Sequence, residues 1–288
     1  MLSRARHASQ KTHQGLASDR QASVLLARDA HTLEAAYDAW AEHYDEDLIQ
    51  LSSGGGGGGC GGGCGGGGEN CPGIAATKVL VKMFDKLVGH VGDKKKNGKD
   101  DDDNNNNDDD DNDDHENDND DHETSKGDDC IRILDFGCGT GRAALYLQEH
   151  GLLDEYNIAL YGCDLSRGML DVAAQRNLYH GLIKADFTES HAPGEGTWDI
   201  VHASGVFAPG QAPPSAFDEF WRLLRPAGVG YAVFTIRVGY YDSDEGSAHR
   251  HHLEQLIKEK KWELVAKPEV DYLPNDDVKA YVFVMRKL

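Results

Sequence analysis

The chain has 288 residues, of which 27% are charged, and a formal net charge of −21 at pH 7. Fifteen acidic residues and no lysine or arginine lie between positions 100 and 123, so the rest of the chain carries only −6. No cluster of basic residues marks a nucleic-acid surface, and no apolar run reaches the roughly 18 residues that a membrane span requires. We therefore expect neither a nucleic-acid partner nor a membrane segment.

The N-terminal segment, residues 1–29, is expected to be flexible because its sequence is mostly polar. Five basic residues and one acidic residue before position 29 are also similar to a mitochondrial transit peptide. The six cysteines show no disulfide pattern, which indicates a reducing compartment. We expect a cytoplasmic protein, with mitochondria as the alternative location.

Two helices are predicted before position 130, each by apolar residues at intervals of three and four. The first covers residues 30–51 and includes Tyr37, Trp40 and Tyr44; the second covers residues 74–88. Low-complexity inserts follow both helices: residues 52–72 are rich in glycine, and residues 93–129 are rich in aspartate and asparagine. Neither insert has enough apolar surface to offset its ordering entropy. We expect both to lengthen loops within one domain that spans residues 30–288.

Neither insert predicts a defined metal site. Cys60, Cys64 and Cys71 could bind zinc, but a fourth ligand is missing from this glycine-rich stretch. The aspartate-rich insert lacks the acidic spacing and the terminal glutamate of a calcium-binding loop. We therefore expect no resident metal.

From position 130 the sequence alternates between short apolar strands and amphipathic helices. Such alternation is typical of a doubly wound, mostly parallel α/β sheet with helices on both faces. The predicted strands are 131–136, 158–163, 182–185, 199–203, 229–236, 262–266 and 280–286. The predicted helices are 142–150, 165–177, 216–224 and 249–261.

A glycine-rich loop, Asp135 to Gly141, joins the first of these strands to the helix that follows. Three glycines at alternate positions allow a tight turn and a close approach to a ligand at the strand's carboxyl end. In the dinucleotide fingerprint G-x-G-x-x-G/A the last small residue would fall at Arg142, which is neither glycine nor alanine. The spacing therefore disfavours a nicotinamide dinucleotide and favours another nucleotide cofactor.

Later strands also end in residues suited to a nucleotide. Asp164, followed by Leu165, stands where an acid can accept the hydrogens of both ribose hydroxyls, although it could instead be the N-cap of the next helix. Asp186 could accept a hydrogen bond from an adenine amino group, and Phe187 could flank the ring. Ala203 and Ser204 are small and would leave room for the reacting end of a cofactor.

In the order of these motifs the sequence resembles the class I S-adenosylmethionine-dependent methyltransferases. The loop is similar to the first motif of that family, and the segment from Leu223 to Gly228 is similar to its Leu-x-Pro-Gly-Gly turn, with Ala227 in place of the first glycine. The resemblance implies a Rossmann-like sheet with an antiparallel last strand, S-adenosylmethionine as the cofactor, and contact between Met169 and adenine.

A more specific resemblance is to the methyltransferase-like proteins of the Williams-Beuren region, through residues 37–45 and 282–288. It implies an N-terminal helical cap over the cofactor, with Trp40 and Tyr44 near the sulfonium, where aromatic faces attract a cation. Alternatively, these rings only pack the helix onto the core. The candidate cofactor-binding residues are Trp40, Tyr44, Asp135, Gly137, Cys138, Gly139, Gly141, Asp164, Leu165, Met169, Asp186, Phe187, Ala203 and Ser204.

These residues predict a methyltransferase that passes a methyl group to a small-molecule acceptor by direct displacement, and we expect a monomer. Such a reaction needs a general base only if the acceptor must first lose a proton. The catalytic residues stay unassigned, with His202, Tyr240 and Tyr241 as candidates. The alternative function is a protein of the same fold that binds the cofactor but acts as an interaction or regulatory module. A nicotinamide oxidoreductase is the second alternative, which Arg142 disfavours.

Overall fold

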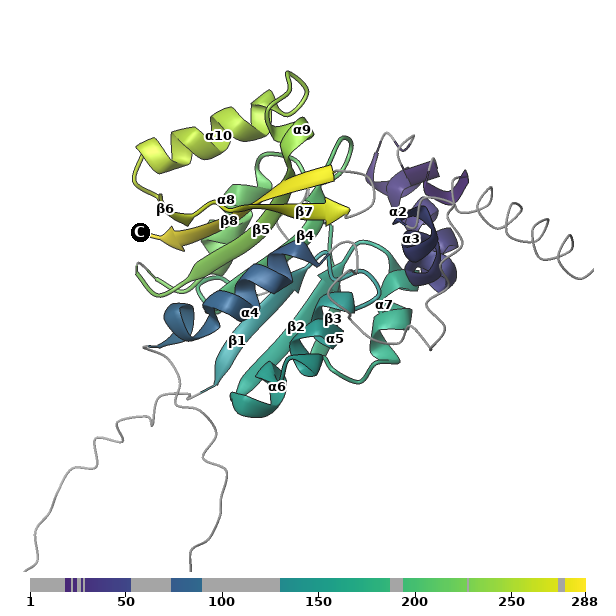
Figure 1. Ribbon diagram of the computed structural model, residues 1–288, viewed down its shortest axis with the longest axis horizontal. Coiled ribbons are helices and arrows are strands. Elements are labelled where there is room, and N and C mark those ends of the chain that lie inside the picture. Colours follow the sequence, from purple (N-terminus) through teal and green to yellow (C-terminus); the bar gives the residue numbers. More distant parts are fainter. Residues whose placement is uncertain are drawn as a thin grey trace, which may run out of the picture.

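The computed structural model describes residues 19–52, 74–89, 130–186, 194–273 and 278–288, apart from residues 22, 25, 26, 28 and 227. Within these ranges the chain forms an eight-stranded sheet flanked by helices (Figure 1). The strands are β1 Ile131–Phe136, β2 Ile158–Asp164, β3 Gly181–Lys184, β4 Ile200–Phe207, β5 Tyr231–Arg237, β6 Trp262–Ala266, β7 Glu269–Leu273 and β8 Val278–Lys287. The helices are α2 Ala30–Trp40, the 3-10 helix η1 Ala41–His43, α3 Tyr44–Ser52, α4 Ala75–Val88, α5 Arg142–Glu149, α6 Leu152–Glu155, α7 Arg167–Ala174, α8 Ala216–Leu223, α9 Val238–Tyr241 and α10 Ser247–Lys258.

The strand order is β3-β2-β1-β4-β5-β8-β6, and β7 pairs with β8 beyond the end of β6. Strands β1 to β5 are parallel to one another, and β8 runs antiparallel to β5. The predicted fold is confirmed, including the antiparallel last strand. The strand order reverses direction between β1 and β4, and such a switch point opens a crevice at the carboxyl ends of the strands.

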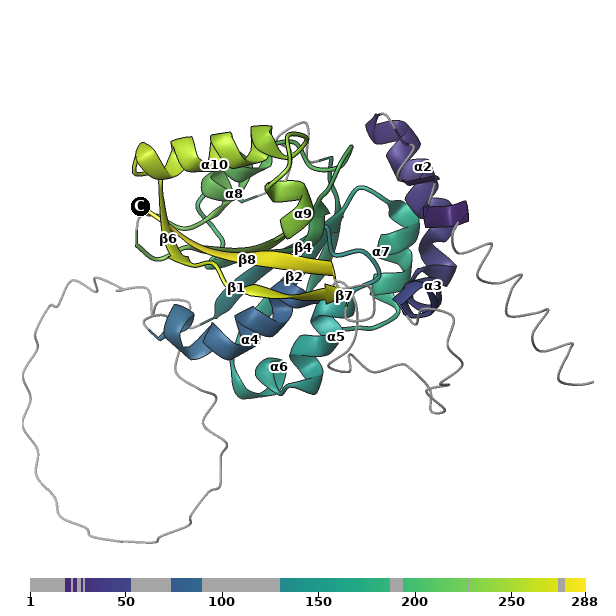
Figure 2. The same ribbon diagram turned by 45° about the horizontal axis from the view of Figure 1, so that its top comes forward.

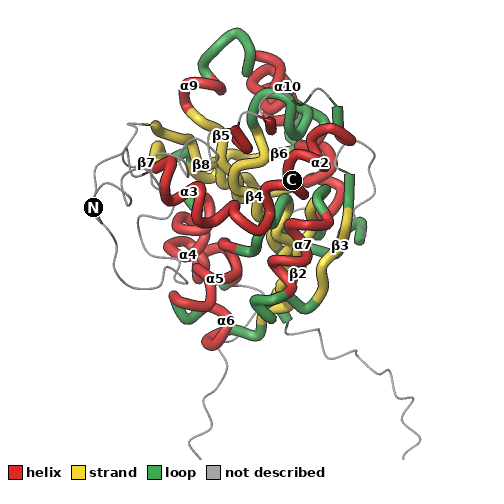
Figure 3. The backbone as a smooth tube through the Cα atoms, turned by 90° about the vertical axis from the view of Figure 1, so that its right-hand side faces the viewer, coloured by secondary structure: helices red, strands yellow, loops and turns green. Residues whose placement is uncertain are grey.

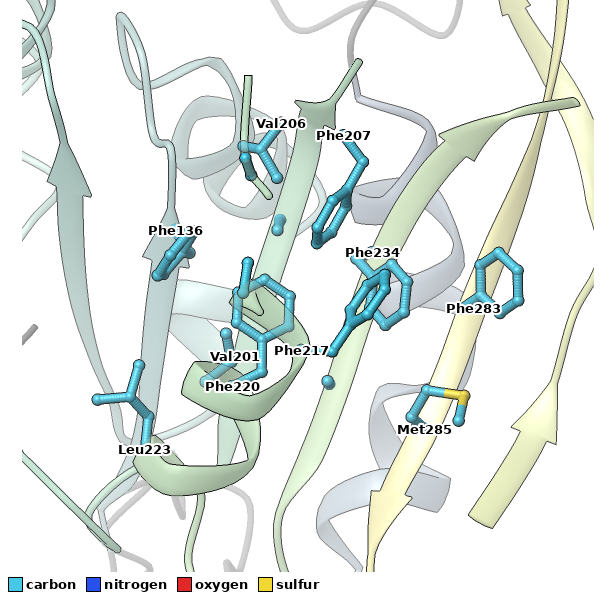
Figure 4. Close-up of a cluster of buried hydrophobic side chains, with 14 of the residues drawn as sticks. Phe136, Val201, Val206, Phe207, Phe217, Phe220, Leu223, Phe234, Phe283 and Met285 are labelled. Carbon is cyan, nitrogen blue, oxygen red and sulfur yellow. The ribbon is translucent and has the colours of Figure 1, made fainter. Parts of the chain in front are cut away.

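The alternation of side chains along each strand divides the core into two layers. In β1, Ile131 and Ile133 pack with α4 and α5, whereas Leu134 and Phe136 pack with α8 on the other face. The second layer is rich in phenylalanine; Figure 4 shows Phe207, Phe217, Phe220 and Phe234 around β4, β5 and α8. Figure 2 shows α4, α5 and α6 on one side of the sheet and α8 and α10 on the other.

Most predicted elements lie within a few residues of their predicted bounds, and three short ones were missed. Strand β4 runs four residues beyond its predicted end, to Phe207. Helices α6 and α9 have only four residues each, too few for helical periodicity to register. Strand β7 was missed because it is short and two of its five residues are acidic, and it is held in place mainly by its pairing with β8.

The N-terminal helices lie across the carboxyl edge of the sheet, over α7 (Figure 3). The helix predicted over 30–51 is present, but η1 interrupts it and turns its axis between α2 and α3. Most of residues 1–29, nearly all of both inserts, and Cys60, Cys64 and Cys71 lie outside the described residues. Among the helices that are described, none combines the length and apolar character needed to cross a bilayer.

Candidate functional site

The glycine loop between β1 and α5 is held against the end of β2 by backbone hydrogen bonds. The amides of Gly137 and Cys138 both donate to the carbonyl of Cys163, at 2.8 and 3.0 Å. Gly137, Gly139 and Gly141 have φ angles of 71°, 52° and 82°, a left-handed backbone that side chains disfavour. At Gly137 a Cβ atom would also lie 2.3 Å from Cγ1 of Val206, so this position requires glycine.

Asp164 connects the end of β2 to this loop. Its Oδ2 accepts a hydrogen bond from the amide of Gly139 at 2.8 Å, and its Oδ1 accepts one from the amide of Ser166 at 2.9 Å. Burial raises the pKa of Asp164 to about 6, although these backbone hydrogen bonds act to lower it. The N-cap of α7 is Ser166, whose Oγ accepts from the amide of Met169, so the alternative role of Asp164 as N-cap does not hold.

A pocket of about 280 Å³ opens above Asp164 and the loop. Eight of the predicted cofactor-binding residues line it: Tyr44, Gly137, Gly139, Asp164, Leu165, Met169, Asp186 and Ser204. The sequence analysis missed the rest of its lining: Asp29, Ala30, Leu33, Tyr37, Gly205, Val206, Gly210, Gln211, Ala212 and Pro213. These residues come from α2 and the segment that begins in β4, two regions that only the fold brings together.

This site agrees with the comparison to known proteins, because residues 133–228 match the model of a methyltransferase domain. This match covers 96 of the 288 residues, a third of the chain. Human methyltransferase-like protein 27 is 34% identical over 138 residues, which are 47% of this chain and 53% of that protein. The malonyl-[acyl-carrier protein] O-methyltransferase of Serratia marcescens is 35% identical over 98 residues, 34% of this chain and 36% of that protein.

Among solved structures, a TehB-like SAM-dependent methyltransferase from Corynebacterium glutamicum is 23% identical, with a TM-score of 0.40 over 55% of this chain and 80% of that one. The chain spans about half or less of the length of the curated relatives named above. The domain match over residues 133–228 agrees with the predicted resemblance to S-adenosylmethionine-dependent methyltransferases.

Five predicted residues of the methyltransferase domain and its cap lie outside the first pocket. Gly141 is the N-cap of α5, Cys138 lies within the loop, and Ala203 is packed in the phenylalanine-rich core layer. Asp135 is 2% exposed and lies beneath the loop, where it accepts a hydrogen bond from the Tyr179 hydroxyl at 2.7 Å. Trp40 lines a second, adjoining pocket. Phe187 lies outside the described residues.

None of the three candidate catalytic residues lines either pocket. His202 is 2% exposed, with Nδ1 2.9 Å from Oδ1 of Asp135 and Nε2 3.0 Å from Oγ1 of Thr77. Its ring therefore connects β4 to β1 and α4 within the core. Tyr240 packs against His249, and Tyr241 packs against Tyr281 and Phe283 near β8.

Charged side chains hold the cap against the domain. Asp45, in α3, accepts a hydrogen bond from Oγ1 of Thr140 at 2.6 Å and pairs with Arg176 and Arg142, the latter at 3.3 Å. Arg142, the residue that breaks the dinucleotide fingerprint, thus contacts the cap helix. Asp38, in α2, accepts from Oγ of Ser166 at 2.6 Å and from the amide of Gly168 at 2.8 Å.

Replacing Asp45 with alanine should loosen the cap without unfolding the sheet. We expect Asp45→Ala to cost about 1 to 2 kcal/mol of cap docking, because charge-assisted hydrogen bonds are lost at a partly exposed site. Hydrogen exchange should then quicken in α2 and α3 while α4 and β5 stay protected. Glu42→Ala, at an exposed position of η1, is the matched control. Equal protection of the cap in both variants would contradict this role for Asp45.

Proposed function

We propose that this chain is a methyltransferase that binds S-adenosylmethionine in the first pocket and transfers its methyl group to a small molecule. The observation that carries the proposal is the position of Asp164. Its carboxylate is fixed by the amides of Gly139 and Ser166, yet it still lines the pocket. A buried carboxylate held in this way is suited to accept hydrogen bonds from two neighbouring hydroxyls, as in a ribose.

The lining of the pocket fits the rest of that cofactor. Asp186 can accept from the adenine amino group, and Leu33, Leu165 and Met169 supply apolar walls for the ring. S-adenosylmethionine supplies a methyl group on a cationic sulfur, which a nucleophile takes by displacement while the electron pair of the broken bond stays on sulfur. Tyr44 offers an aromatic face to that cation. The chain's own task is to align the acceptor and exclude water.

The cap supports a small acceptor. Tyr37 and Tyr44 from the cap, and Gln211 from the segment after β4, lie over the same edge of the sheet; the side-chain oxygen of Gln211 accepts a hydrogen bond from the Tyr37 hydroxyl at 2.9 Å. An acceptor that reaches the cofactor would therefore bind beneath the cap residues. This arrangement favours a small-molecule acceptor over a large protein or nucleic-acid surface.

Two measurements on the full chain test the proposal. Calorimetric titration should show binding of S-adenosylmethionine, and incubation with methyl-labelled cofactor and metabolite extracts should give a labelled small molecule detectable by mass spectrometry. Binding without transfer across a broad acceptor panel would favour the interaction or regulatory module instead. No heat of binding at millimolar cofactor would exclude both the methyltransferase and the cofactor-binding regulatory module.

Cofactor affinity should depend on pH through Asp164. Only the ionised carboxylate accepts from both ribose hydroxyls, so affinity should rise as pH increases through about 6, the raised pKa of this group.

The stability of the free protein should change with pH in the opposite direction. Because the native state binds this proton more tightly than the unfolded state does, the contribution of Asp164 to the free energy of unfolding falls between pH 3.8 and about 6. Calorimetry from pH 5 to 8 checks the affinity, and Asp164→Asn should flatten its profile. A pH profile unchanged by Asp164→Asn would refute this assignment.

A further inference from the structure

A second pocket, of about 130 Å³, adjoins the first and shares Tyr37, Tyr44, Gly205 and Gln211 with it. Its other walls are Gln21, Val24, Trp40, Leu48, Phe207, Ala208, Thr235, Arg237 and Tyr272. They come from the N-terminal segment, the cap, and the ends of β4, β5 and β7. A molecule in this pocket would therefore lie beside the cofactor pocket and beneath the same cap.

Of the described residues that line the second pocket, Arg237 alone is charged. It is the last residue of β5 and is half-buried. Its guanidinium has no hydrogen bond or ion pair with any residue that the structure describes. Asp47, the buried carboxylate of the cap, is paired with Arg20 and not with Arg237: Nε of Arg20 donates to its Oδ2 at 2.6 Å. A partly buried guanidinium that has no carboxylate partner is suited to bind an anion.

Two tyrosine hydroxyls add to this set of donors. Neither the Tyr44 nor the Tyr272 hydroxyl makes a hydrogen bond to a described residue, and burial raises the pKa of both phenols. Both therefore stay protonated at neutral pH and can donate. Tyr272 lies where the two pockets meet, because its hydroxyl oxygen is 3.0 Å from the position that a Cβ of Gly205 would take. Among the described residues that line this pocket, none carries a carboxylate that would compete for these donors.

We propose that the second pocket is the acceptor site and that Arg237 binds an oxyanion, a carboxylate or phosphate, on the methyl acceptor. The apolar side chains of Val24, Trp40, Leu48 and Phe207 would hold the carbon frame of the same molecule. The inference rests on the proposed function, since it places an acceptor beside the cofactor. It adds the chemical class of that acceptor, an organic anion.

Calorimetry with matched probes tests the inference. The full chain, saturated with S-adenosylhomocysteine, is titrated with phenylacetate, phenyl phosphate and the uncharged phenylacetamide. We expect the better anion to bind at least about tenfold more tightly than the amide, because a charge-assisted contact to a guanidinium is made only by the anion. The two anions distinguish a carboxylate acceptor from a phosphate one.

Three variants show whether Arg237 is the cause. Arg237→Gln should abolish the preference for the anion, and Arg237→Lys should retain part of it. Arg286→Gln removes the same charge from β8, where Arg286 pairs with Tyr231 at the other end of β5, and should leave the preference unchanged. The inference would be overturned if the anion and the amide bound with equal affinity, or if no anion bound at millimolar probe. It would also be overturned if the preference for the anion survived Arg237→Gln in a folded variant. Because S-adenosylhomocysteine binding is measured first, failure of the proposed function is seen separately.

Discussion

Replacing Asp164 with alanine should weaken S-adenosylmethionine binding by about 1.5 to 3 kcal/mol, roughly 10-fold to 150-fold. Two effects add. The variant loses the acceptor for the ribose hydroxyls, and it leaves the amides of Gly139 and Ser166 without their partner, so the loop is less well ordered for the cofactor. Calorimetric titration of the purified variant measures the loss directly.

Asp171→Ala is the matched control for this experiment. Asp171 follows Asp164 closely in sequence and lies in α7. Its side chain is 59% exposed and pairs with Arg167. Its loss should leave cofactor affinity within about twofold, as exposed ion pairs contribute little. Unchanged affinity in Asp164→Ala would place the ribose contact elsewhere in the pocket.

Replacing Gly137 with alanine should destabilise the protein by about 2 to 5 kcal/mol and abolish cofactor binding at micromolar concentrations. The new Cβ would lie 2.3 Å from Cγ1 of Val206, and the φ of 71° disfavours any side chain. The loop would have to move away from β4, and the residues of the loop that line the pocket would be displaced. Chemical denaturation measures the stability, and calorimetry measures the binding.

A double variant separates the two causes. Gly137→Ala with Val206→Ala removes the contacting methyl group but keeps the left-handed backbone, so it should recover only part of the lost binding. Gly196→Ala is the control for backbone strain alone, because φ is 65° there and a Cβ would meet nothing within 4 Å. It should cost about 1 kcal/mol. If Gly137→Ala were no worse than Gly196→Ala, the contact with Val206 would not matter.

The strands and the glycine loop could be predicted from the sequence because their signals are local. β1 has the bounds that the sequence predicted, and the glycine spacing predicted the tight turn, in which the structure shows a left-handed backbone at Gly137, Gly139 and Gly141. Edge strand β7 could not be predicted, since its conformation depends on hydrogen bonds to β8. The local sequence pattern predicts a helix or strand when the side chains of that segment make its contacts with the core.

Several residues that the sequence analysis named line the first pocket, and two of them lie at the ends of strands. Asp164 ends β2 and Asp186 comes two residues after β3, and the carboxyl ends of parallel strands meet at one edge of the sheet. Tyr37 and Gln211 line the pocket but were missed as site residues, since their positions depend on how the cap and the segment after β4 dock. The apolar repeat that predicts the first helix does not reveal which of its aromatic residues faces the cofactor.

By itself, the sequence determined the α/β class, the glycine loop and the two carboxylates, since each depends on residues close together in the chain. Tertiary structure decided the roles of the remaining residues. It placed Asp135 and His202 in a buried contact beneath the loop, paired Arg142 with Asp45 of the cap, and set Arg237 in the second pocket. The physical reason is that a polar side chain takes its role from its partners, and these partners lie tens of residues away in sequence.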